Sequence, residues 1–200
     1  MAAIQNSMKA VLRKHMKELM KTALSPETIS KQSEAVTIKV LQHEAFRQAQ
    51  RVSIYLSTSD ELSTTELLRE MFRLEKHVFV PSYQGTQMKM LRLKDMNEYE
   101  HLPLSKWNIK QPDFKDARED ALTNGHGIDL FIVPGVAFTR TGSRLGHGMG
   151  YYDKYLLQHA EKYPHKKTTI MALALNEQMV EDLPMDEQDV RLHYVMTEHA

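Results

Sequence analysis

Short apolar runs alternate along the chain with longer segments of helical spacing, and this alternation limits the possible folds more than any other feature. The strongest apolar run is Ile128-Asp-Leu-Phe-Ile-Val133, which Pro134 and Gly135 close. Further short runs, most of them rich in β-branched and aromatic residues, predict strands at residues 51–56, 77–80, 88–93, 168–175 and 194–197. Apolar residues at helical spacing predict helices at residues 2–22, 26–49, 64–73 and 150–163. Strands that alternate with helices of this length form βαβ units, so we expect a mainly parallel sheet.

Local signals define the boundaries of these elements. Ser25-Pro26 is typical of a helix start, with Ser as the N-cap and Pro at the first helical position. Pro81 is expected to end the strand at residues 77–80, and the polar segment 94–124 is expected to be mostly loop. No internal repeat, low-complexity tract or interdomain linker is visible. We therefore predict a single α/β domain over residues 1–200, with three layers: a mainly parallel sheet with helices on both faces.

Composition excludes several classes of protein. The chain has no cysteine, which rules out disulfides, thiolate catalysis and cysteine-based metal sites. Lys plus Arg and Asp plus Glu both number 26, so no net charge attracts nucleic acid or an anionic membrane. We see neither a secretory signal nor an apolar run of about 18–20 residues that could span a bilayer. We expect a cytoplasmic monomer whose partners are small molecules, with no nucleic acid and no membrane.

The segment from Gly142 to Asp153 is the most informative for function, because it holds four of the eight glycines between a strong strand and a helix. Glycines at positions 146, 148 and 150 let the backbone approach a bulky anion and turn its N–H groups inward. The helix start that follows adds a positive dipole end. Arg144 can neutralise charge on a transferred phosphoryl group, and Asp153 is a natural magnesium ligand. The segment matches neither the Walker pattern nor G-x-G-x-x-G, and a flexible glycine-rich turn is the alternative.

Residues 144–153, Arg-Leu-Gly-His-Gly-Met-Gly-Tyr-Tyr-Asp, resemble the signature of the 5-formyltetrahydrofolate cyclo-ligases, also called methenyltetrahydrofolate synthetases. Five other segments resemble the same family in the same order: the Lys9 and Arg13 pair, residues 53–61, 107–112, 129–135 and 183–189. The resemblance thus covers nearly the whole chain. His147 and Met149 stand where relatives often carry Arg or Tyr and Lys or Gly. Met149 therefore removes one possible phosphate contact.

The resemblance implies an enzyme that closes 5-formyltetrahydrofolate into 5,10-methenyltetrahydrofolate and releases ADP and phosphate. In the implied mechanism ATP phosphorylates the formyl oxygen, and N10 then attacks the activated carbon. The implied catalytic residues are Arg144 and Tyr152, and the implied ligands of Mg²⁺ are Asp153 and Asp189. The implied ATP-binding residues are Lys9, Arg13, Arg144, Leu145, Gly146, His147, Gly148, Met149, Gly150, Tyr151 and Tyr152. The implied substrate-binding residues are Leu56, Glu61, Trp107, Gly148, Met149, Gly150, Tyr151 and Tyr152.

Structural alternatives exist for several of these residues. Lys9 and Arg13 could form a solvated basic helix face, and Glu61 could cap the helix that follows it. Trp107 could be a core residue, and Asp189 could belong to an acidic surface run. The ten histidines lack metal-binding spacing, which argues against zinc. Two other functions also remain open: a sugar-phosphate isomerase or CoA-transferase-like enzyme that uses no nucleotide, and a non-catalytic folate- or nucleotide-binding protein.

Overall fold

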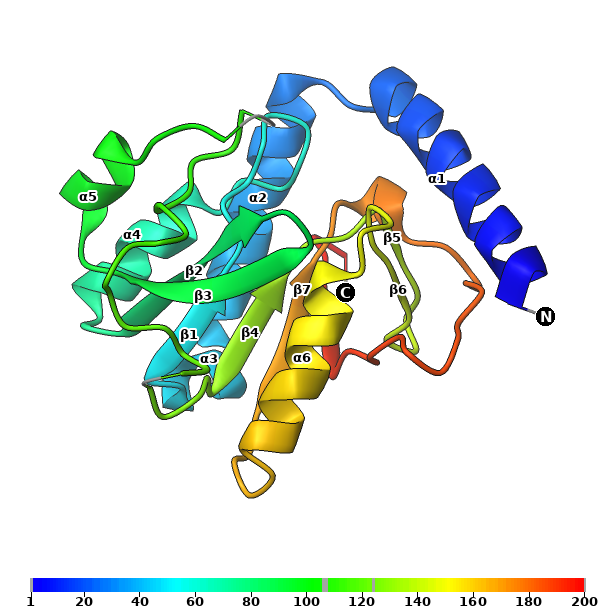
Figure 1. Ribbon diagram of the computed structural model, residues 1–200. Helices are drawn as coiled ribbons and strands as arrows, with labels where there is room; N and C mark the ends of the chain where they lie inside the picture. The colour runs from blue at the N-terminus through cyan, green and yellow to red at the C-terminus, as the bar shows by residue number, and fades with distance from the viewer. Residues whose placement is uncertain (1, 106–107, 124, 200) are drawn as a thin grey trace.

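The protein, seen here as a computed structural model that describes residues 2–105, 108–123 and 125–199, is built on a six-stranded sheet (Figure 1). The strand order is β3-β2-β1-β4-β7-β8, and every neighbouring pair is parallel except β2 and β3. The strands of this sheet are β1 (Arg51–Ile54), β2 (His77–Gln84), β3 (Gln87–Leu93), β4 (Leu130–Val133), β7 (Thr169–Leu173) and β8 (Tyr194–Met196). The predicted mainly parallel α/β fold is confirmed.

Helices lie on both faces of this sheet, with α2 behind it and α6 in front of it in Figure 1. The helical segments are α1 (Ala2–Ala23), α2 (Pro26–Gln42), α3 (Glu44–Gln48), α4 (Thr65–Arg73), α5 (Met96–His101), α6 (Tyr151–Lys162) and the 3₁₀ turn η1 (Asn176–Gln178). A separate two-stranded sheet pairs β5 (Ala137–Phe138) with β6 (Arg144–Leu145). Within the described part of the chain, no helix combines the length and apolarity that crossing a membrane requires.

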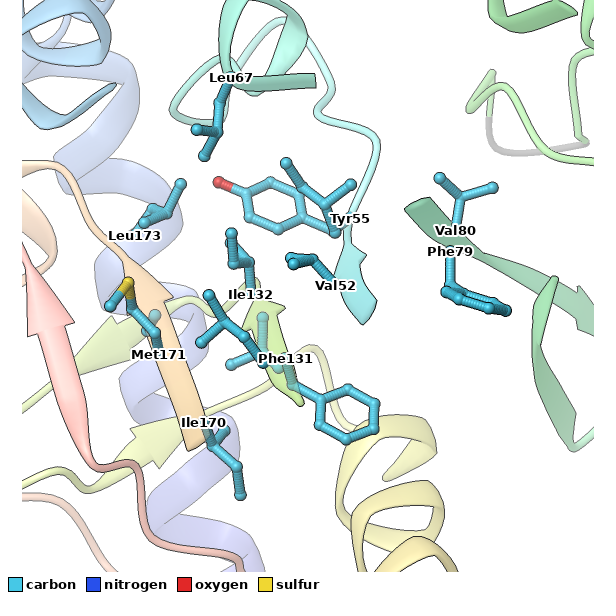
Figure 2. Close-up of a cluster of buried hydrophobic side chains, with 14 of the residues drawn as sticks. Val52, Tyr55, Leu67, Phe79, Val80, Phe131, Ile132, Ile170, Met171 and Leu173 are labelled. Carbon is cyan, nitrogen blue, oxygen red and sulfur yellow. The ribbon is translucent and has the colours of Figure 1, made fainter. Parts of the chain in front are cut away.

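The core explains why the run at residues 128–133 is so apolar. All four residues of β4 are completely buried, since β4 lies between β1 and β7 and has helices on both faces. Phe131 points towards α6, where its ring meets Tyr155 edge-on at 6.0 Å between centroids. Figure 2 shows Ile132 on the other face, in a cluster that α4 covers with Leu67. A strand covered on both faces has no solvent-facing position, so it does not alternate between apolar and polar residues.

Two predicted boundaries are wrong, and each has a local cause. The helix predicted at residues 26–49 is two helices, because His43 is extended (ψ 133°) and its ring nitrogen accepts the Ala45 N–H at 3.2 Å. Strand β2 continues through Pro81 to Gln84. Its pairing with β1 ends at Phe79, and beyond that point β2 pairs with β3 alone. Pro81 has no N–H to donate, and it is tolerated here because one edge of β2 needs no hydrogen-bond donor.

The described part of residues 94–124 is mostly loop, as predicted, with the short helix α5 near its start. Asp95 caps this helix by accepting the Glu98 N–H at 2.8 Å. The start of α2 is confirmed, since Ser25 Oγ accepts the Thr28 N–H at 3.1 Å. The β5–β6 pair was not predicted, because two-residue strands carry no readable periodicity.

The order of the strands creates a point at which the chain connections diverge. Strand β1 connects through α4 to β2 on one side, whereas β4 connects through α6 to β7 on the other. Because β1 and β4 are parallel neighbours, their carboxyl ends meet at this point. Ligands of open α/β sheets bind at such a switch point. The segment that follows β1 carries Leu56 and Glu61, and the segment that follows β4 leads into the glycine loop, defined here as residues 146–150.

Protonation of His159 couples the packing of α6 to pH. Its Nε2 atom accepts the Ile128 N–H at 2.8 Å, and its ring stands edge-on to Phe131 at 5.0 Å. Burial lowers the pKa of His159 to about 4, and the nearby Lys166 charge adds to this effect, so the ring is neutral in the folded protein. In the unfolded chain the pKa returns to about 6.5, so the proton favours the unfolded state as pH falls from about 6.5 towards 4.

The free energy of unfolding should fall from pH 7 to pH 5 in the wild type. We predict that it falls by about 1 to 2 kcal/mol less in His159→Gln. The glutamine oxygen can still accept a hydrogen bond but does not titrate. Urea denaturation at both pH values measures the difference. His165→Gln, at an exposed position, is the control and should keep the wild-type dependence on pH. Equal losses in His159→Gln and the wild type would contradict the role assigned to this ring.

Candidate functional site

Glu61 lies in the turn that follows β1, where its carboxylate is held by Thr58. Its Oε2 atom accepts the Thr58 backbone N–H at 2.8 Å and the Thr58 hydroxyl at 3.1 Å. Helix α4 begins after Thr64, its N-cap, and no side chain caps it. The alternative that Glu61 caps this helix is therefore wrong. Its second oxygen, Oε1, lies 3.9 Å from His147 Nε2 in the glycine loop, so the segments after β1 and β4 do meet.

The charge state of this pocket suits recognition of N–H groups. Burial alone would raise the pKa of Glu61, but the nearby His147 ring and the hydrogen bonds from Thr58 outweigh it and lower the pKa. Glu61 is therefore ionised at neutral pH and can accept hydrogen bonds from a ligand. Burial raises the pKa of Tyr152 well above its ordinary value, and Tyr83 and Glu61 add to the shift. The Tyr152 hydroxyl therefore stays protonated.

The glycine loop joins β6 to α6 and is held from outside by Arg13 of α1. Arg13 Nε donates to the Gly146 carbonyl at 2.7 Å. Gly148 and Gly150 have φ angles of +104° and +65°, and Gly150 is the N-cap of α6. Side chains rarely tolerate these conformations, so the loop requires glycine at both positions. A Cβ atom at position 148 would also come within 3.4 Å of the Arg13 guanidinium carbon.

Arg144 and Asp153, at the two ends of the signature segment, form a buried ion pair. Arg144 Nη2 lies 2.7 Å from Asp153 Oδ2, and the two side chains are 4% and 18% exposed. Arg144 Nη1 also donates to the Pro134 carbonyl at 3.3 Å. The other oxygen of Asp153 accepts the Val190 N–H at 3.1 Å. This bond brings Asp153 next to the backbone that carries Asp189.

Lys9 connects α1 to residues 183–189, called here the acidic turn, which run beside α1 in Figure 1. Its ammonium lies 2.7 Å from Asp186 Oδ2 and 2.5 Å from Asp189 Oδ2, and the residue is 6% exposed. Burial alone would lower the pKa of Lys9, but the hydrogen bonds to both aspartates outweigh it and raise the pKa. The alternative of a solvated face is therefore wrong for Lys9.

The remaining predicted site residues have differing environments. Leu56 is buried at the carboxyl end of β1, and Leu145 packs among apolar side chains, so only the backbone of Leu145 could meet a ligand. His147 and Met149 are exposed at the tip of the glycine loop. Tyr151 donates its hydroxyl to the Gly85 carbonyl at 2.5 Å. Trp107 lies outside the described residues.

The two carboxylates assigned to the predicted Mg²⁺, Asp153 and Asp189, form ion pairs with Arg144 and Lys9 in this structure. Within the described ranges, no group of three or more His, Asp or Glu side chains is arranged to hold a metal ion. Magnesium is commonly held by one or two carboxylates together with phosphate oxygens and water. The Asp153–Val190 bond places the two carboxylates on adjoining segments, and this donor set fits an ion that arrives with a nucleotide.

Three further residues of the site were missed in the sequence. Thr58 anchors Glu61, Asp186 shares Lys9 with Asp189, and the Tyr83 ring lies 4.9 Å from the Tyr151 ring. Tyr83 escaped notice because β2 was expected to end at Pro81. The carboxylates at 186 and 189, three residues apart and directly after Leu183-Pro184, were a signal that could have singled out Asp186.

The fold and the site together define an α/β enzyme with a glycine-rich anion loop at the switch point of a mainly parallel sheet. A comparison with protein families narrows this class. Residues 5–198 match the model of the 5-formyltetrahydrofolate cyclo-ligase family. The chain therefore belongs to that family, and not to the isomerases or CoA transferases that its sequence left open.

Individual relatives agree with the family assignment. The chain is similar to the 5-formyltetrahydrofolate cyclo-ligase of Mus musculus, with 41% identity over 100% of this chain and 98% of the relative. It is also similar to a probable 5-formyltetrahydrofolate cyclo-ligase of Caenorhabditis elegans, with 36% identity over 99% and 96% of the two chains. Among solved structures, the 5,10-methenyltetrahydrofolate synthetase of Aquifex aeolicus matches with a TM-score of 0.76 and 27% identity, over 96% of this chain and 91% of that one.

We predict that Lys9→Met loosens α1, because it breaks both ion pairs and leaves two carboxylates facing each other. A charge-assisted hydrogen bond contributes about 1.5–3 kcal/mol, so amide hydrogens of α1 should exchange about ten- to a hundred-fold faster. Hydrogen exchange read by mass spectrometry measures this. Lys14→Met, at an exposed position on the same helix, is the matched control and should keep the wild-type rate. Equal exchange in both variants would show that Lys9 does not hold α1.

Proposed function

We propose that this enzyme converts 5-formyltetrahydrofolate into 5,10-methenyltetrahydrofolate, using ATP and Mg²⁺ and releasing ADP and phosphate. The observation that carries the proposal is the approach of Glu61 Oε1 to His147 Nε2, at 3.9 Å. It brings together the carboxylate expected to bind the pterin and the loop expected to bind the phosphates. Membership of the cyclo-ligase family and the names of the relatives support the same reaction.

The proposed reaction proceeds in two steps. The oxygen of the formyl group on N5 is a poor leaving group and must first be activated. It attacks the γ-phosphorus of ATP, and ADP is released. N10 then adds to the activated formyl carbon, and loss of the N10 proton and of inorganic phosphate leaves the methenyl bridge between N5 and N10. Little covalent chemistry falls to the protein, whose contribution is to orient two substrates and to stabilise charge during phosphoryl transfer.

On the folate side, Glu61 would accept hydrogen bonds from N–H groups of the pterin, since it is ionised and already fixed by Thr58. Leu56 would give an apolar contact to the same ring system. Tyr152 would act as a hydrogen-bond donor, because its hydroxyl is protonated and lies near both Glu61 and Arg144. The position of the pterin would thus be set by Glu61, Leu56 and Tyr152, whose side chains are largely buried in the folded protein.

On the nucleotide side, the backbone N–H groups of the glycine loop would cradle the phosphates. Arg144 would stabilise the charge that develops on the transferred phosphoryl group. Arg13 contacts the same loop from α1, and Lys9, one helical turn away, pairs with Asp189; both would add further cations. Magnesium, held by Asp153 and Asp189, would neutralise phosphate oxygens when bound.

The decisive experiment mixes the purified protein with 5-formyltetrahydrofolate and MgATP and follows the near-ultraviolet absorbance of the methenyl product. ADP should form in equal amount. We predict no turnover without nucleotide or in the presence of EDTA, because the loop and the two aspartates are assigned to one phosphate–metal site. Full conversion under either condition would refute the mechanism. Binding of both ligands without any product would instead identify a non-catalytic member of the family.

We predict that Glu61→Gln weakens folate binding about ten- to a hundred-fold, the equivalent of a hydrogen bond to a charged group of about 1.5–3 kcal/mol. ATP binding should change by less than about two-fold. Calorimetric titration with each ligand measures both constants. Glutamine can still accept the Thr58 N–H, so the turn should persist, and a thermal melt verifies this. Glu34→Gln, at an exposed position on α2, is the control. A similar loss for both ligands would indicate that Glu61 only maintains the turn.

A further inference from the structure

A cavity lined in part by Tyr151 lies next to the glycine loop. It has a volume of about 270 Å³ and lies between α6, β3 and the segment of residues 114–123. Tyr151 and Lys154 contribute to it from the first turn of α6, and Lys89 contributes from β3. None of the residues assigned above to the nucleotide or the metal lines this cavity, apart from Tyr151. The cavity therefore has no role in the chemistry described so far.

The charges of this cavity favour an anion. Lys154 makes no side-chain hydrogen bond or ion pair within the described part of the chain, and it is exposed. Lys89 donates to the Phe114 carbonyl at 3.0 Å and lies 4.4 Å above the Phe114 ring, without a carboxylate partner among the described residues. Asp120 also lines the cavity, but it is 6% exposed and already accepts the Leu122 N–H at 3.0 Å. Two lysines thus face one carboxylate that is already hydrogen-bonded.

Apolar and aromatic groups form the rest of the wall. Met88, Phe114 and Tyr155 all line the cavity. Tyr155 is 2% exposed, so it contributes ring surface to the wall. A cavity of this kind suits a ligand that combines an aromatic ring, a polar amide and carboxylate groups.

Tyr151 links this cavity to the glycine loop. It follows Gly150 directly, its ring contacts Tyr83, and its hydroxyl is fixed on Gly85 at the β2–β3 turn. The Lys154 backbone N–H donates to the Gly150 carbonyl at 3.1 Å, so Lys154 lies one helical turn from the loop. A ligand whose reacting end lies at the glycine loop can therefore reach Lys154 with its other end.

We propose that this cavity binds the p-aminobenzoylglutamate tail of the folate, with Lys154 and Lys89 receiving its glutamate carboxylates. The inference rests on the proposed function, which fixes only the pterin end of the substrate. The tail consists of a benzene ring, an amide and at least two carboxylates. The benzene ring matches the aromatic wall of the cavity, and the carboxylates match its two lysines.

The test compares 5-formyltetrahydrofolate with 5-formyltetrahydropteroate, which lacks the glutamate. Lys154→Gln should lower kcat/KM for the glutamate-bearing substrate about five-fold, as expected for loss of one exposed charge contact. It should leave kcat/KM for the pteroate substrate within about 1.5-fold, because that substrate has no carboxylate to lose. Lys162→Gln, on the same helix but outside the cavity, is the matched control and should change neither value. Equal losses for both substrates, or no loss for either, would overturn the proposal.

A binding measurement separates this proposal from the proposed function. The probe is p-aminobenzoylglutamate alone, titrated calorimetrically into the wild type and the Lys154→Gln and Lys162→Gln variants. The proposal expects binding that weakens about five-fold in Lys154→Gln only. If the wild type binds the probe in this way but converts neither folate, the proposed function fails and the tail site stands. If both folates are converted and the probe does not bind, the tail site fails and the function stands.

Discussion

The pairing of β4 between β1 and β7 is the constraint on which the rest of the structure depends. Every residue of β4 is completely buried, so this strand can occupy only a central position covered on both faces. Once β4 is central, its connection must leave on the opposite side from that of β1. The two segments that diverge there carry Glu61 and the glycine loop, which meet through His147. The site is thus a geometric consequence of how the core is buried.

Charge balance is the second constraint, because the site holds several buried ions. Lys9 pairs with Asp186 and Asp189, and Arg144 pairs with Asp153. A buried charge without a partner is strongly destabilising. On the proposed function, an incoming nucleotide with Mg²⁺ would bring charges of both signs. Lys9 and Arg144 could then pair with phosphate oxygens, and Asp153 and Asp189 could hold the metal ion. These buried side chains would thus exchange partners without leaving any ion unpaired. Binding of the nucleotide or of Mg²⁺ alone would leave some of them unpaired and would cost more free energy.

The sequence predicted the parallel sheet and most helices, since these follow from local periodicity. The shared role of Glu61 and the glycine loop was implied only by the resemblance to the cyclo-ligase family. The sequence could not predict the pairing of Lys9 with Asp186 and Asp189, which lie 177 and 180 residues away along the chain. Such contacts depend on how α1 returns across the sheet edge, and no local pattern encodes that path. The break at His43 was missed because a local hydrogen bond, from the Ala45 N–H to the His43 ring, stabilises it. The passage of β2 through Pro81 was missed because it depends on the pairing of β2 with its neighbours, which the residue's own preference does not show.

The first turn of α6 joins the two parts of the proposed folate site. Tyr151 and Tyr152 are consecutive, and on a helix their side chains diverge by about 100°. Tyr152 is directed into the buried pocket near Arg144 and Glu61, whereas Tyr151 borders the cavity that contains Lys154. Contacts far from the reacting atoms can contribute binding energy that orients the reacting end of a substrate. Because one rigid helical turn carries both tyrosines, a tail bound beside Lys154 would fix the distance of the pterin from the glycine loop. The proposed tail site would then affect the orientation of the formyl group as well as affinity.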